Sequence, residues 1–231
     1  MTSGTDLRPT YGIRRGTVDD APVAARLHAE QITTGFLPFL GPRFLERLYR
    51  RVVLWDGGLL LVAVDRSESR AATPGAVVGF IASADRVSSL YRAFLLYDGV
   101  PAALRAAGPL LRNWRRVLET LHHGSSGSPG VGRGAEVLAM AVDADNQGQG
   151  LGGRLVTAFL AEVAAAGGRE AYTVIAQDNA ASLALYGRSG FTPGAAFEFH
   201  AGTTSVIMQW DAPPAGGPIG TAGPPDAAGS I

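Results

Sequence analysis

The sequence predicts a single α/β domain, and three observations lead to this fold class. Helical and strand periodicities alternate through residues 11–210. Residues 137–142 form an unbroken apolar run of the kind found in buried strands, and this run ends in a glycine-rich turn. A helical pattern follows the turn directly. We therefore expect the order β-α-α-β-β-(extra helices)-β-α-β-α-β-β.

The first half of the chain begins with a predicted short strand at residues 11–15. Thr17, followed by two acidic residues, predicts the capped start of a helix that runs to about Glu30. A second amphipathic helix is predicted for residues 44–53, since its apolar residues recur at helical spacing up to Gly57. Residues 59–64 and 76–82 are β-rich runs joined by a polar turn, so they predict a hairpin.

Residues 86–123 have helical spacing and predict a helical insertion, interrupted at Gly108 and Pro109. Its arginines are consistent with a solvated helix face, and we assign no site to them. They are Arg105, Arg112, Arg115 and Arg116.

The second half of the chain predicts strands and helices in alternation. Strands are expected at residues 136–142, 171–177, 191–199 and 203–210, and helices at 151–166 and 180–188. Composition predicts a disordered lead at residues 1–10, a flexible Gly/Ser linker at 124–134 and a disordered Pro/Gly/Ala tail at 211–231. Residues 11–210 would then form one domain.

Composition excludes several kinds of chemistry. The 231-residue chain has a net charge of +0, which gives no general attraction to nucleic acid or to an anionic membrane. Every basic residue is arginine and there is no cysteine, so lysine Schiff bases, thiolate nucleophiles and disulfides are excluded. No stretch approaches the ~18 apolar residues of a membrane span. We expect a cytoplasmic protein, a monomer or a homodimer, that binds a small-molecule or peptide partner and no metal.

Glycines gather where the predicted helix at 151–166 begins. Gly148, Gly150, Gly152 and Gly153 leave several backbone N–H groups open to an anion at the positive end of the helix dipole. A diphosphate is the expected ligand. The alternative is that these glycines only permit a tight turn.

Two kinds of cofactor fit this turn. Gly148-x-Gly150-x-x-Gly153 matches the dinucleotide fingerprint, and Asp178 lies close to where a ribose-binding acid is expected. A dinucleotide fold needs several more strand and crossover units after the fingerprint, however, and only a short helix and two strands remain. The context therefore argues against a nucleotide-dependent oxidoreductase.

The second interpretation, Gln147-x-x-Gly150-x-Gly152 after a strand, resembles the GNAT superfamily of acetyl-CoA-dependent N-acetyltransferases. Residues 135–152 look like the pyrophosphate motif of that family throughout. Residues 179–191 match its other signature, at Asn179, Leu185, Tyr186, Gly190 and Phe191. The resemblance covers about residues 11–210 and implies a mixed, largely antiparallel central sheet flanked by helices, with acetyl-CoA as co-substrate. The helical insertion is similar to that of a subset of the family.

The resemblance also implies roles for individual residues. The backbone of Met140, Ala141 and Val142 would hold the pantetheine arm and the acetyl group. Asn179 would contact the cofactor, and Tyr186 would protonate the departing thiolate as general acid; spacing alone also allows Tyr186 to be a core aromatic. The pyrophosphate would be held by Gln147, Gly148, Gln149, Gly150, Leu151, Gly152 and Gly153.

The general base is the open part of the predicted site. Glu136, at the start of the pyrophosphate-motif strand, is the first choice, with a solvent-facing structural carboxylate as the alternative. His28 and Glu30 border the expected acceptor side, and deprotonation through ordered water is a further alternative. Relatives that acetylate protein N-termini carry a glutamate where this chain has Val174, which argues against that substrate class.

We expect an N-acetyltransferase that moves acetyl from acetyl-CoA to a primary amine of a small metabolite, amino sugar or peptide by direct attack. The alternative from another class is a catalytically idle acyl-CoA-binding module that acts as a sensor or scaffold.

Overall fold

A seven-stranded sheet forms the centre of the computed structural model, which describes residues 11–32, 41–67, 75–98, 132–200 and 203–213. The strand order is β1-β2-β3-β4-β5-β7-β6. Every neighbouring pair is antiparallel except β4–β5, which is parallel. The strands are β1 Tyr11–Arg15, β2 Gly58–Asp65, β3 Val77–Ala84, β4 Ala135–Val142, β5 Glu170–Ala176, β6 Thr192–His200 and β7 Thr203–Asp211.

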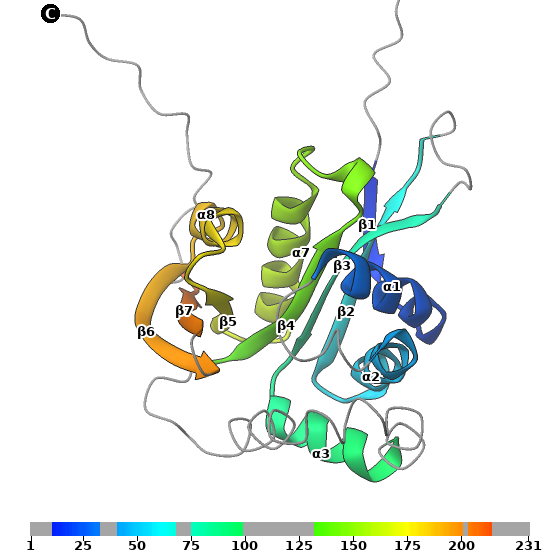
Figure 1. Ribbon diagram of the computed structural model, residues 1–231, viewed down its shortest axis with the longest axis horizontal. Helices are drawn as coiled ribbons and strands as arrows, with labels where there is room; N and C mark the ends of the chain where they lie inside the picture. Colours follow the sequence, from blue (N-terminus) through cyan, green and yellow to red (C-terminus); the bar gives the residue numbers. More distant parts are fainter. Residues whose placement is uncertain (1–10, 33–40, 68–74, 99–131, 201–202, 214–231) are drawn as a thin grey trace, which may run out of the picture.

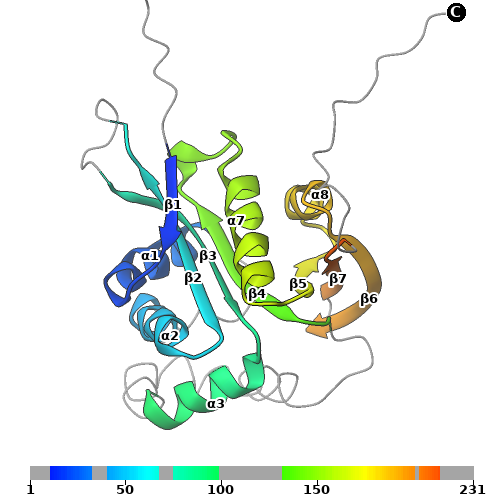
Figure 2. The ribbon, with the colours of Figure 1, turned by 180° about the vertical axis from the view of Figure 1, so that it is seen from behind.

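Helices cover both faces of the sheet (Figures 1 and 2). The helices α1 (Ala21–Gln31) and α2 (Pro42–Leu54) pack on one face, where Leu27, Leu45 and Phe80 are fully buried. On the opposite face α7 (Leu151–Ala165) packs through its apolar stripe. The strands β2 and β3 are buried on both faces, which explains why their sequences are apolar without alternation.

A partly buried ion pair fixes the start of α1. Asp20, in the 3-10 helix η1 (Val18–Asp20), accepts hydrogen bonds from Arg14 at 2.7 and 2.8 Å and from the backbone N–H of Thr17 at 2.7 Å. These contacts hold the pKa of Asp20 below its usual value, with the Arg14 hydrogen bond as the largest cause. Strand β1 is thereby joined to the helix that follows it.

The two halves of the sheet are joined by a short parallel bridge. β4 pairs with β5 only through Ala135–Ala171, Glu136–Tyr172 and Val137–Thr173. The pairing of β4 with β3 shifts by one residue at Leu138, where a bulge bends the strand. Beyond Val137 the two strands diverge, and we call this opening the fork.

The described elements agree with the sequence-based order, and the sheet is mixed and largely antiparallel as the resemblance implied. A single parallel pair is incompatible with the doubly wound parallel sheet that the dinucleotide fingerprint requires, so that alternative is wrong.

The insertion begins with α3 (Val87–Tyr97). The rest of the insertion, most of the linker and the loop at 33–40 lie outside the described residues, as do residues 1–10 and 214–231. None of the helices within the described ranges has the length and apolar character that a bilayer crossing requires.

Candidate active site

The turn between β4 and α7 leaves its backbone open. Gly148 and Gly150 have φ angles of 73° and 74°, in the left-handed region that favours glycine. A Cβ atom at either residue would meet no atom within 4 Å, so the space above the turn is free. Gly150 is the N-cap of α7 and no side chain caps the helix there, so the first N–H groups face outward. This cradle fits a diphosphate.

Gly152 and Gly153 have a different reason to be glycine. A Cβ at Gly152 would lie 3.3 Å from a methyl carbon of Leu185, and one at Gly153 would lie 3.9 Å from the same side chain. Leu185 belongs to α8 (Ala180–Arg188), so these glycines allow α8 to pack closely against the start of α7. The sequence pattern therefore combines two requirements, an open anion cradle and a close contact between helices.

The side chain of Gln147 turns back onto the protein. Its Nε2 donates to the backbone oxygen of Val142 at 2.9 Å and to Oε1 of Gln31 at 3.0 Å. Gln147 therefore holds the turn against the end of β4 and the end of α1. This contact to a strand end explains why a long amide side chain is found at this point of the motif.

Tyr11 supports the turn from the first strand, a role that no local sequence pattern indicates. Its hydroxyl donates to Oε1 of Gln149 at 3.0 Å and accepts from Nδ2 of Asn146 at 3.1 Å. Arg154, in the first turn of α7, donates to the backbone oxygen of Tyr11 at 2.7 Å and lies over its ring at 6.0 Å. The turn is held in shape from both sides by these contacts.

The strand residues predicted to hold the pantetheine arm line the fork. Met140, Ala141 and Val142 pair with β3 on one edge, and they lie beyond the last residue that pairs with β5 on the other. In an antiparallel ladder alternate residues direct their N–H and C=O groups away from the partner. Those groups are available to an extended, amide-containing ligand.

Tyr186 reaches the fork from α8. Its side chain is 4% exposed, and its ring packs edge-on against Phe191 with 5.0 Å between centroids. Burial raises the pKa of Tyr186, and a hydrogen bond with Thr173 opposes that rise. Thr173 forms the last bridge pair and donates to the backbone oxygen of Val137 at 3.4 Å. Tyr186 is thus a core aromatic by its packing and also places a hydroxyl beside the point of divergence.

Glu136 lies in the bridge and is partly buried. Its Oε2 accepts a hydrogen bond from the Tyr172 hydroxyl at 2.6 Å. Burial raises the pKa of Glu136, and the Tyr172 hydrogen bond offsets part of the increase. Tyr172 of β5 and Tyr91 of α3 lie close to this carboxylate, so it is only partly open to solvent.

Glu136 and Tyr186 lie on opposite faces of the sheet. Side chains alternate along a strand, and Val137 packs in the cluster that contains Tyr186 and α7. Glu136 therefore points to the other face, where α1, α2 and α3 pack. The Glu136 carboxylate and the Tyr186 phenol thus flank the fork from the two faces of the sheet. Glu136 belongs to the middle bridge pair, and Tyr186 lies beside Thr173 of the last bridge pair.

The remaining base candidates differ in environment. His28 is 2% exposed, its Nδ1 lies 2.5 Å from the Tyr49 hydroxyl, and its Nε2 has no hydrogen-bond partner within the described ranges. Burial lowers the pKa of His28 to about 4, so the imidazole is neutral at pH 7. Glu30 is exposed and pairs with Arg26 at 2.7 Å on the surface of α1. Neither residue has the contact to the fork that Glu136 has.

Asn179 is the N-cap of α8, where its Oδ1 accepts from the backbone N–H of Ser182 at 3.0 Å. The side chain is exposed, and capping leaves its amide NH₂ available as a donor. This capping role accounts for an asparagine at that position on local grounds.

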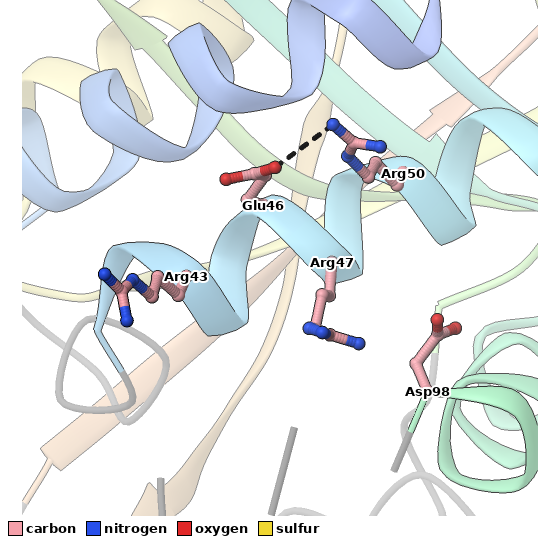
Figure 3. Close-up of a pocket in the computed structure, with 5 residues that line it drawn as sticks. All are labelled: Arg43, Glu46, Arg47, Arg50 and Asp98. Atoms are coloured by element: carbon pink, nitrogen blue, oxygen red, sulfur yellow. Dashed lines mark ion pairs between the residues drawn. The ribbon is translucent and has the colours of Figure 1, made fainter. Parts of the chain in front are cut away.

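A cavity of about 470 Å³ lies elsewhere, against α2 and the end of α3 (Figure 3). Glu46 pairs with Arg50 at 3.2 Å in its wall, and Asp98 pairs with Arg51 at 2.7 Å. The cavity contains none of the predicted site residues. The cavity is lined by Arg43, Glu46, Arg47, Arg50 and Asp98.

Comparison with known families agrees with this geometry. The model of the acetyltransferase (GNAT) family matches residues 31–191, more than half of the chain. The chain belongs to the GNAT family. The members of this family are described as acetyltransferases.

Two curated relatives match over shorter stretches. The chain is 39% identical over 79 residues to mycothiol acetyltransferase from Kocuria rhizophila, covering 34% of this chain and 24% of the relative. It is 41% identical over 69 residues to mycothiol acetyltransferase from Geodermatophilus obscurus, covering 30% of this chain and 21% of the relative. This GNAT chain thus matches less than a quarter of the length of either relative.

Solved structures share the GNAT fold at low sequence identity. Arabidopsis thaliana NAA60 in complex with a bisubstrate analogue has a TM-score of 0.58 at 14% identity, covering 88% of this chain and 98% of that chain. A putative GNAT acetyltransferase from Desulfovibrio desulfuricans has a TM-score of 0.56 at 14% identity, covering 87% of this chain and 99% of that chain. These likenesses show the fold.

Proposed function

We propose that this protein is an N-acetyltransferase that moves acetyl from acetyl-CoA to a primary amine of a small metabolite, amino sugar or peptide by direct attack. The observation that carries the proposal is the fork, flanked by Glu136 on one face and Tyr186 on the other. The diphosphate cradle lies at the end of the same strand.

The cofactor would lie along β4. Its pyrophosphate fits the N–H groups from Gly148 to Gly153 at the start of α7, where the helix dipole stabilises negative charge. The open edge of Met140, Ala141 and Val142 would pair with the amides of the pantetheine arm. The thioester, which supplies the activated acetyl group, would then reach the point where β4 and β5 part.

Glu136 is suited to accept a proton from the acceptor's ammonium group. Its raised pKa brings a carboxylate closer to the basicity that this transfer needs. The neutral amine then attacks the acetyl carbonyl carbon, and the new C–N bond replaces the C–S bond. No covalent bond to the protein forms in this scheme, which suits a chain without cysteine.

Tyr186 is placed to deliver a proton to the departing sulfur. Burial raises its pKa, so the phenol stays protonated at neutral pH and can donate. Its position beside Thr173 supports this role, since the bridge ends there. The first proton lost by the ammonium is held by Glu136 until it passes to solvent. The nitrogen loses a second proton as the tetrahedral adduct collapses to the amide, and this proton replaces the one that Tyr186 gives to the departing sulfur.

The acceptor class is supported by two observations. The curated relatives are named mycothiol acetyltransferase, which supports small metabolites as acceptors. Val174 stands where some protein N-terminal acetyltransferases carry a glutamate, and it is a partly buried residue without an acidic group. We therefore place small amines and amino sugars before protein N-termini.

The proposal is tested by measuring thiol release from acetyl-CoA with a panel of amines, amino sugars and short peptides. Wild type should release thiol with at least one class, and Glu136→Gln should release it much more slowly. Tyr97→Phe is the matched control, because Tyr97 is 71% exposed and its ring lies against Arg51 of α2. Tight acetyl-CoA binding with no release across the panel would support an acyl-CoA sensor instead.

A further inference from the structure

We infer that Tyr172 is a positioning residue whose hydroxyl orients the Glu136 carboxylate at the fork and keeps it ready to accept a proton. This inference rests on the proposed role of Glu136 as base. Its basis is a side-chain pair inside the bridge between β4 and β5.

The register of the two strands places the pair. Glu136 is the direct partner of Tyr172 in the middle of the three-residue bridge, so both side chains leave the sheet on the same face. The Tyr172 hydroxyl donates to Oε2 of Glu136 at 2.6 Å, a short distance typical of a bond to an ionised oxygen. This bond occupies one carboxylate oxygen and leaves the other for an acceptor amine.

Gly132 holds the Tyr172 ring in place. A Cβ atom at Gly132 would overlap Cγ and Cδ2 of Tyr172, so the backbone lies directly against the ring. Tyr172 itself is 8% exposed. A ring confined in this way keeps its hydroxyl aimed at Glu136, which lowers the freedom of the carboxylate at no cost during the reaction.

Two titratable groups face Glu136 from the elements around it. Tyr172 approaches from β5, and Tyr91 approaches from α3, where the charge of Glu136 adds to burial in raising the pKa of Tyr91. Burial and Glu136 also raise the pKa of Tyr172, so both phenols remain protonated over the working pH range. The Tyr172 hydrogen bond lowers the pKa of Glu136 against the effect of burial. Its removal should therefore raise that pKa further.

The test compares the pH dependence of kcat/KM in wild type and Tyr172→Phe, with an acceptor found in the amine panel. The acidic limb should move up by about one pH unit in Tyr172→Phe. The KM for acetyl-CoA should stay the same, since Tyr172 faces away from the diphosphate cradle. Tyr97→Phe should leave the limb in place. A limb at the same pH in all three proteins would overturn the inference.

A second measurement does not depend on turnover. The carboxyl ¹³C signal of Glu136, assigned by its loss in Glu136→Gln, is titrated in wild type, Tyr172→Phe and Gly132→Ala. Gly132→Ala keeps the hydroxyl but displaces the ring, so both variants should titrate at higher pH than wild type. Equal titration midpoints would show that Tyr172 does not act on Glu136. Full activity of Glu136→Gln would instead remove the proposed base, whatever the titrations show.

Discussion

Tyr11 donates a hydrogen bond to Gln149 at 3.0 Å, which ties the first strand to the glycine turn far along the chain. The same hydroxyl accepts from Asn146 at 3.1 Å. Two residues of the turn are therefore held by one buried phenol. The shape of the diphosphate cradle depends on a residue outside the glycine motif.

Tyr11→Phe should weaken acetyl-CoA binding by about fivefold to 30-fold, because it removes two hydrogen bonds that contribute roughly 1 kcal/mol each. Isothermal titration calorimetry measures this change. The KM for the amine should not change, since the Tyr11 hydroxyl bonds to residues of the glycine turn. Unchanged affinity for acetyl-CoA would show that the turn keeps its shape without the hydroxyl.

Gly150→Ala should destabilise the protein and weaken acetyl-CoA binding. An alanine at a φ of 74° costs about 1–2 kcal/mol, and relief of this strain would move the N–H groups of the cradle. Gly187→Ala is the matched control, because Gly187 lies within α8, has no positive φ and has open space around its Cα. That substitution should be neutral or stabilising by up to about 1 kcal/mol. Urea unfolding and calorimetry measure the two effects, and equal outcomes for both variants would contradict the assigned role of Gly150.

Tyr186→Phe should lower kcat by roughly 100-fold, as expected for loss of a general acid. The KM for acetyl-CoA should change little, because the ring still packs against Phe191. Loss of one hydroxyl from the core should leave the protein folded, and a thermal melt checks this. Steady-state kinetics at saturating amine give the kcat of wild type and of Tyr186→Phe. Equal kcat values would remove Tyr186 from the mechanism.

His28 should make the fold sensitive to mild acid. Its folded pKa of about 4 lies below its ordinary value of 6.5, so the unfolded chain takes up a proton first as the pH falls. Stability should be full above about pH 6.5 and should decline by up to about 1.4 kcal/mol per pH unit down to pH 4. Urea unfolding at pH 7, 6 and 5 should show a shallower decline for His28→Gln than for wild type. Parallel declines would indicate that other groups cause the acid sensitivity.

The sequence predicted the order of the elements and the glycine turn before α7, because both depend on local patterns. The apolar run before Gly148 indicated a buried strand, and Asn179 indicated the start of α8. Residues that act across long sequence separations left no local signal. Tyr11 and Tyr172 are examples: each is an ordinary strand aromatic until the fold brings Gln149 or Glu136 to it.

The surroundings of Glu136 show the same limit from another side. A carboxylate at the start of a strand is usually solvated, and only the packing of β5 and α3 near it determines that this one is partly buried. Only part of the role of the glycines could be inferred from the local sequence. Positive φ at Gly148 and Gly150 follows from the turn, whereas the contact of Gly152 with Leu185 depends on how α8 packs.

Because only three residue pairs join β4 to β5, the sheet is held together less firmly there than between its other neighbouring strands. The segment from β5 to β7, together with α8, is connected to the rest of the sheet by few backbone hydrogen bonds, while β2, β3 and β4 are joined along most of their length. A pantetheine arm in the fork would contact both parts of the sheet and hold them together. Amide protons of residues 171–176 and 205–210 should then exchange more slowly once acetyl-CoA is bound, so the substrate would also complete the fold.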